Sequence, residues 1–115
     1  MISAAVHGKS QEIGDIKKLV LLSQYDKARV AIDKFLGAEK NAAKPEGWYY
    51  KAVTYNALSR TATNTLDVNK KLNEESYEAL QKYKQLDPAA ELTVKEENST
   101  YYNIYSSFYD LGVKN

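Results

Sequence analysis

One stretch, residues 45–58, restricts the fold of this chain more than any other. It begins with Pro45, which has a fixed φ and no N–H to leave unbonded, and therefore suits the first turn of a helix. At 3.6 residues per turn, Trp48, Ala52 and Tyr55 then fall on one stripe. A large aromatic, a small residue and a second aromatic on one stripe are typical of a helix buried between two close partner helices. We therefore expect the rest of the chain to supply those partners.

Apolar residues at steps of three and four predict further helices on both sides of this stretch. The expected helices span residues 10–23, 25–36, 46–59, 66–86 and 98–112. The run 39–44 is predicted to be a linker and the polar run 60–65 a loop, whereas residues 89–97 are either a short helix or an extension of the next one. No segment has the alternating pattern of a strand. The predicted fold class is all-α, with about five helices.

Charge and composition exclude several classes of protein. The chain has 16 basic and 15 acidic residues and no basic block, so it lacks the electrostatic footprint of a nucleic-acid-binding protein. No apolar run is long enough to span a membrane. The absence of cysteine excludes disulfides and thiolate metal sites, but it leaves the compartment open. We expect a soluble protein, either cytoplasmic or exported.

The first nine residues are set apart from the predicted helical domain of residues 10–115. Val6 and Gly8 resemble the residues around the cleavage site of a bacterial export signal, although no basic or long apolar region precedes them. The alternative is a flexible N-terminal segment. The sequence leaves both interpretations open.

The aromatic-small-aromatic pattern recurs along the chain, and the recurrence resembles a known family. The first unit is Trp48-x-x-x-Ala52-x-x-Tyr55, and residues 101–108 repeat its spacing. Residues 25–35 and 76–88, the latter ending in Leu-Asp-Pro, look like the partner helices of such units. Together these segments resemble about two and a half degenerate tetratricopeptide repeats.

The resemblance implies a short right-handed superhelix of stacked antiparallel helix pairs, in which small residues permit close helix approach and large ones fill the space between pairs. The sequence departs from the family at Lys51, where a leucine is usual, and in a long insertion between Tyr55 and Ser76. Because the last predicted helix would lack a partner, we expect the chain to be the N-terminal part of a longer repeat protein. The core positions implied by the resemblance are Ala28, Ile32, Phe35, Trp48, Ala52, Tyr55, Ser76, Leu80, Tyr83, Tyr101, Ile104 and Phe108.

In this family the first helix of each pair lines a concave groove that binds peptides. The positions that would face this groove are Glu46, Tyr49, Val53, Asn56, Tyr102, Ser106 and Tyr109. Tyrosine suits such a surface because it offers a large amphipathic contact at low entropic cost. The alternative is that the tyrosines pack against neighbouring helices.

The sequence has no pattern that indicates an enzyme. His7 is the only histidine, so a zinc site would need carboxylates alone. The glutamates occur at the spacing of a solvated helix face, and no glycine-rich phosphate loop is present. We therefore expect no cofactor, no metal and no catalytic residue. The predicted function is a scaffold that binds a protein or peptide, and the alternative is an assembly module that stacks on further repeats or self-associates through its last helix.

Overall fold

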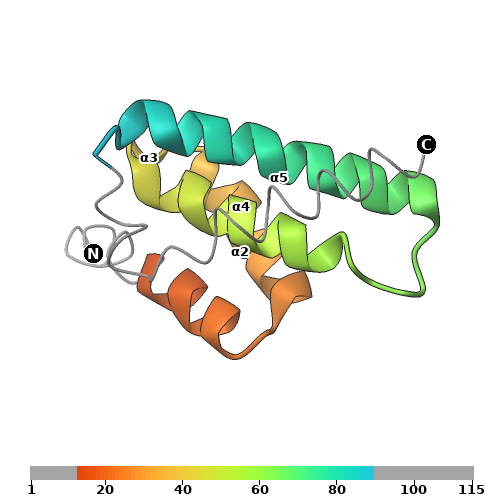
Figure 1. Ribbon diagram of the computed structural model, residues 1–115. Coiled ribbons are helices and arrows are strands. Elements are labelled where there is room, and N and C mark those ends of the chain that lie inside the picture. Colours follow the sequence, from red (N-terminus) through yellow and green to blue (C-terminus); the bar gives the residue numbers. More distant parts are fainter. Residues whose placement is uncertain (1–12, 90–115) are drawn as a thin grey trace.

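The computed structural model of the protein describes residues 13–89, and these residues are helical apart from short connections (Figure 1). A first helix runs through residues 13–21, followed by α2 (Tyr25–Leu36), α3 (Glu39–Ala42), α4 (Pro45–Leu58) and α5 (Leu66–Leu86). No strand occurs within residues 13–89. The predicted all-α fold class is therefore confirmed.

Several predictions concern residues outside this range. The segment 1–9 and the helix 98–112 lie outside the described residues. So do the core positions Tyr101, Ile104 and Phe108 and the groove positions Tyr102, Ser106 and Tyr109.

The helix boundaries follow local signals in the sequence. The chain leaves the first helix at Ser23, whose φ of 58° lies in the left-handed region. There the Gln24 N–H donates to the Leu19 carbonyl and the Ser23 N–H to the Val20 carbonyl, which is the Schellman arrangement. At the start of α5 the Thr65 hydroxyl accepts a hydrogen bond from the Val68 N–H, as a helix N-cap does.

Helix α3 corrects one prediction, because residues 39–44 were expected to form only a linker. Two tertiary hydrogen bonds hold this short helix in place. The Asn41 amide donates to the Phe35 carbonyl, and the Trp48 indole N–H donates to the Ala42 carbonyl at 2.9 Å. A helix of four residues is not stable on its own, so these bonds to α2 and α4 explain why it forms.

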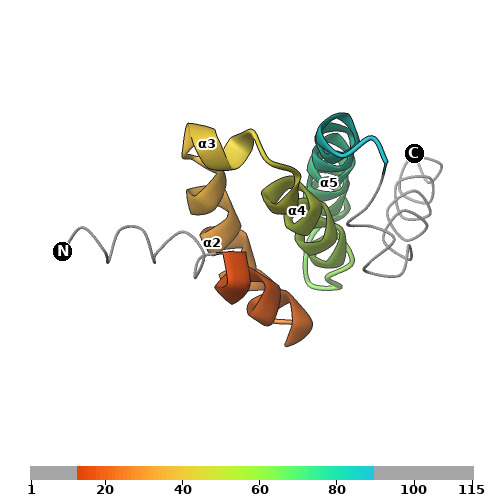
Figure 2. The same cartoon turned by 90° about the vertical axis from the view of Figure 1, so that its left-hand side faces the viewer.

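Helix α4 is the centre of the arrangement, with α2 on one side of it and α5 on another (Figure 2). It contacts α2, α3 and α5, and α5 runs antiparallel to it. Its buried residues are spread around the whole helix: Gly47, Tyr49, Tyr50, Ala52, Thr54, Tyr55 and Asn56. A helix that is covered on most sides is expected to lack a single apolar stripe.

The core contains most of the positions expected from the sequence. Eight of them are buried: Ala28, Ile32, Phe35, Ala52, Tyr55, Ser76, Leu80 and Tyr83. Trp48 is half-buried and packs against the edge of this core. Ile16 of the first helix also belongs to this core, and that helix lies below α4 in Figure 1.

Close approach between α2 and α4 depends on Gly47. A Cβ atom at this position would lie 2.7 Å from the Leu36 Cδ2 atom and 3.0 Å from the Phe35 Cδ2 atom. These separations are shorter than van der Waals contact, so the end of α2 rests directly on the backbone of α4.

Candidate functional site

The four predicted groove positions within the described residues do not form one continuous surface. Glu46 is exposed and Val53 is half-buried, but Tyr49 and Asn56 are only 2% and 5% exposed. Tyr49 packs against Tyr83 of α5 with 5.3 Å between ring centres, and its ring meets that of Tyr50 edge-on. Helix α5 therefore covers the part of α4 that carries Tyr49, and Glu46 and Val53 remain as the accessible part of the predicted groove.

The seam between α4 and α5 is polar as well as close. The Ser76 hydroxyl donates a 2.7 Å hydrogen bond to the Ala52 carbonyl. The side-chain nitrogens of Asn56 and Asn73 are buried, and no partner for them is present among the described residues. Because unpaired buried polar groups cost free energy, this region of α4 is less stable than an apolar seam would be.

A second cluster lies where α2 meets α4. The Tyr55 hydroxyl donates to the carboxylate of Asp33 and lies 2.9 Å from both of its oxygens. The Arg29 guanidinium carbon lies 5.2 Å from the centre of the same ring. The Lys51 ammonium lies 5.0 Å from that ring centre and 5.6 Å from the centre of the Trp48 ring. We call Arg29, Asp33, Trp48, Lys51 and Tyr55 the cation–aromatic cluster.

The environment of Tyr55 changes its acidity. Burial and the hydrogen bond to Asp33 raise the pKa of Tyr55 to about 12, and the nearby Arg29 opposes part of that rise. The phenol therefore stays neutral and keeps donating to Asp33 across the physiological pH range.

No pattern in the sequence singled out Arg29 or Asp33, and Lys51 stood out only as a departure from the family pattern. Arg29 and Asp33 are four residues apart and so share one side of α2, which was the only signal in the sequence. That signal did not show which ring of α4 they would meet. The packing of α2 on α4 brings them together.

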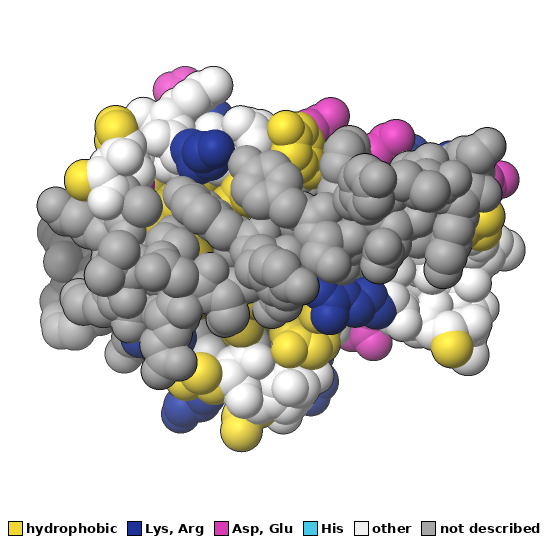
Figure 3. Space-filling model, in the orientation of Figure 1, with side chains coloured by type: hydrophobic (Ala, Val, Ile, Leu, Met, Phe, Trp, Pro, Cys, Tyr) yellow, Lys and Arg dark blue, Asp and Glu magenta, His cyan; other side chains and the backbone are white. Residues whose placement is uncertain are grey.

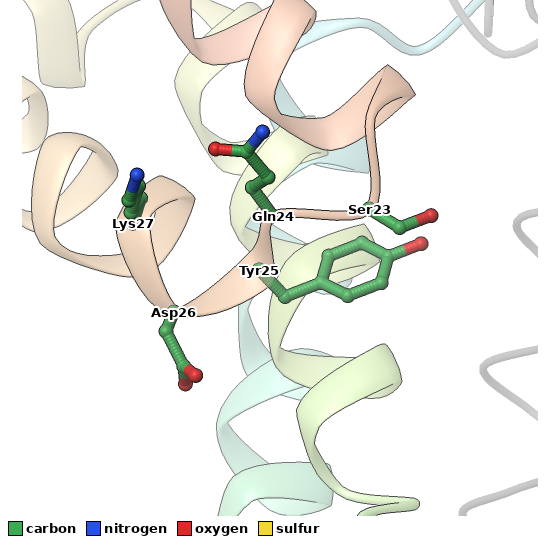
Figure 4. A pocket seen from close by; sticks show the side chains of 5 residues that line it. All are labelled: Ser23, Gln24, Tyr25, Asp26 and Lys27. Carbon is green, nitrogen blue, oxygen red and sulfur yellow. The ribbon is translucent and has the colours of Figure 1, made fainter.

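The turn between the first helix and α2 contains an open depression of about 310 Å³, lined by Ser23, Gln24, Tyr25, Asp26 and Lys27. The Ser23 and Tyr25 side chains point the same way, whereas Asp26 and Lys27 point away from each other (Figure 4). Ligand sites combine an apolar lining with a few convergent polar groups. This depression lacks that convergence, and we assign no ligand to it.

Residues 13–89 carry neither a metal-binding group nor a membrane-spanning helix. This part of the chain has no group of three or more histidine, cysteine or carboxylate side chains placed to hold a metal ion. Nor does it include a helix with the length and apolar character needed to cross a bilayer. Acidic side chains are spaced along the edge that α5 forms in Figure 3.

Comparison of the chain with models of known protein families, with curated proteins and with solved structures finds no match. The resemblance to tetratricopeptide repeats therefore stays a prediction from the sequence.

Proposed function

We propose that the protein is a non-enzymatic scaffold, similar to tetratricopeptide-repeat proteins, that binds a protein or peptide. The observation that carries this proposal is the stacking of α2, α4 and α5 side by side, with α4 between the other two (Figure 2). Repeat proteins are built in this way, because each helix pair buries its faces against its neighbours and leaves an extended surface for partners.

The interior contacts of α4 support the same function. Its backbone is approached closely on two sides, by Ser76 of α5 at Ala52 and by α2 at Gly47. Small residues at helix crossings are what a stacked array needs. The buried aromatic residues fill the space between the helices, so the interior serves packing.

The binding surface we propose includes Glu46 and Val53, the accessible part of the predicted groove. These residues are seven positions apart and therefore lie on the same side of α4, two turns from each other. A charged and an apolar side chain on one side of a helix suit a polar rim beside a hydrophobic contact.

A photo-crosslinking experiment tests this proposal in cells that express the protein. A photoreactive phenylalanine analogue replaces Glu46 in one variant and Glu78, an exposed residue of α5, in the control. We expect one or a few discrete protein adducts from position 46 and none of the same mass from position 78. Identical adducts from both positions, or no adduct from position 46, would contradict the proposal.

The alternative, an assembly module, is favoured by a different observation. Leu21 at the end of the first helix, Leu22 in the turn after it and Val30 of α2 are 70%, 59% and 70% exposed. Neighbouring exposed apolar side chains, such as those of Leu21 and Leu22, favour association. Light scattering that gives twice the monomer mass, reduced to the monomer mass by Leu22→Glu, would support this alternative. A monomer at all concentrations would contradict self-association.

A further inference from the structure

We propose that the cation–aromatic cluster is a second contact surface and that it binds an acidic segment of a partner protein. This proposal goes beyond the scaffold function because the cluster lies on a different side of α4 from Val53. Lys51 and Tyr55 are each two positions from Val53, which places them about 160–200° around the helix from it. The two surfaces can therefore be tested separately.

Aromatic rings hold both cations of the cluster. Arg29 and Lys51 lie over aromatic rings at 5.0–5.6 Å from the ring centres. A ring face attracts a cation through its quadrupole but carries no net charge. The contact therefore holds each cation in position without neutralising it, and both remain able to pair with an anion.

The cluster contains one carboxylate, that of Asp33. The Tyr55 hydroxyl donates to the Asp33 carboxylate, at equal distances from its two oxygens. Two cations and one anion leave a net charge of about +1 on this surface. This local excess of positive charge suits carboxylate groups of a partner, one for each cation. Complementary charges guide and align such contacts.

The two cations of the cluster are more accessible to a partner than the aromatic ring beneath them. Arg29 is exposed and Lys51 is half-buried, whereas the Tyr55 ring beneath them is 2% exposed. A buried ring fixed by Asp33 is a rigid base for the two cations. Because the two cations are held in place before binding, less side-chain entropy is lost when each forms an ion pair with the partner.

A polyanion such as RNA fits this surface less well. Non-specific binding to nucleic acid depends on several cations and increases with each phosphate that is neutralised. The cluster offers two cations beside a carboxylate, and the net charge of the whole chain is only +1. An acidic peptide, by contrast, can pair one carboxylate with each of these two cations, so it does not need further cations.

The single tryptophan makes the test direct, because the Lys51 ammonium lies over its ring. The full chain is titrated with a hexaglutamate peptide while Trp48 emission is recorded in low salt. We expect a saturable change in emission that disappears in 0.5 M salt. Lys51→Met and Arg29→Met, which keep much of the aliphatic stem, should each weaken binding about fivefold, the effect expected for one exposed charge pair.

The matched control is Lys71→Met, which removes an exposed cation from α5. It should bind the peptide as the unsubstituted chain does, and circular dichroism should show that all three variants keep their helix content. Equal weakening by Lys71→Met, or no saturable binding, would overturn the proposal. Tighter binding of a hexauridylate than of hexaglutamate would overturn it in favour of RNA. Crosslinking from position 46 would be unaffected in either case, so failure here is distinguishable from failure of the scaffold function.

Discussion

The Ser76 hydroxyl lies 2.7 Å from the backbone carbonyl of Ala52, so α5 touches the backbone of α4 at this point. Both residues are fully buried. A larger residue at position 52 or 76 would separate the two helices. Replacing Ser76 with a residue that has no hydroxyl would remove the hydrogen bond.

Substitutions at Ser76 should separate these two effects. Ser76→Ala removes one buried hydrogen bond and should lower the free energy of unfolding by about 1 kcal/mol. Ser76→Leu also forces the helices apart and should cost about 2–4 kcal/mol, because overpacking adds to the lost bond. Urea unfolding followed by circular dichroism measures both values. If the two variants were equally stable, the close contact at Ala52 would be wrong.

Two glycines offer a matched comparison of packing and helix propensity. Gly47→Ala would place a Cβ atom against Leu36 and Phe35, and we expect a net loss of about 1–2 kcal/mol, since the clash exceeds the gain in propensity. Gly14 lies in the first helix, and a Cβ atom there would meet no packing neighbour within 4 Å. Gly14→Ala should therefore stabilise the protein by about 0.5–1 kcal/mol. Thermal unfolding of both variants measures the difference. A stabilising Gly47→Ala would contradict the close approach of α2 and α4.

The raised pKa of Tyr55 predicts a pH dependence of stability at alkaline pH. The folded state favours the neutral phenol, so its contribution is complete below pH 10, the ordinary value, and is lost as the pH rises through about 12. The full pKa shift of Tyr55 corresponds to about 2–3 kcal/mol of unfolding free energy. Solvent around the exposed Asp33 carboxylate reduces this contribution to about 1–2 kcal/mol.

Tyr55→Phe isolates this contribution from other groups that titrate in the same range. The difference in unfolding free energy between the unsubstituted chain and Tyr55→Phe should shrink as the pH rises from 10 to 12. Asp33→Asn removes the charge that faces the hydroxyl and should weaken the dependence. A difference that stays constant over this range would show that Tyr55 does not donate to Asp33.

The left-handed backbone at Ser23 predicts a stabilising substitution. A non-glycine residue at a φ of 58° carries a steric cost of about 1 kcal/mol, which Ser23→Gly would remove. The greater flexibility of glycine in the unfolded chain offsets part of this gain. We expect a net stabilisation of about 0.5 kcal/mol, seen as a rise in the thermal midpoint. Ser23→Ala keeps the steric cost and should give no such rise.

Much of the fold could be predicted from residues near one another in the sequence. The predicted helix 25–36 agrees with the observed one, and α4 begins one residue earlier than expected, at Pro45. The predicted helix 66–86 agrees with α5, and the loop 60–65 lies between α4 and α5. Helix α3 was missed because groups outside its own four residues hold it, the carbonyl of Phe35 in α2 and the indole of Trp48 in α4.

The candidate sites were predicted less well. One interpretation of the sequence placed Tyr49 and Val53 on the same open groove surface, and the alternative packed the tyrosines against neighbouring helices. In the structure α5 covers Tyr49 and leaves Val53 half-buried. The cation–aromatic cluster was not predicted, since Arg29 and Tyr55 come from helices whose relative rotation no local pattern describes.

The sequence alone determined where the chain is helical, because capping residues, proline and the spacing of apolar residues act within a few positions of each other. Only the tertiary structure decided what each side of α4 contacts. This helix has aromatic or small residues all round, so it has no single apolar stripe to orient it. Its rotation is set by the close contacts of Gly47 with α2 and Ala52 with α5, and those contacts determine that Tyr49 is buried while Lys51 lies beside Arg29 over one ring.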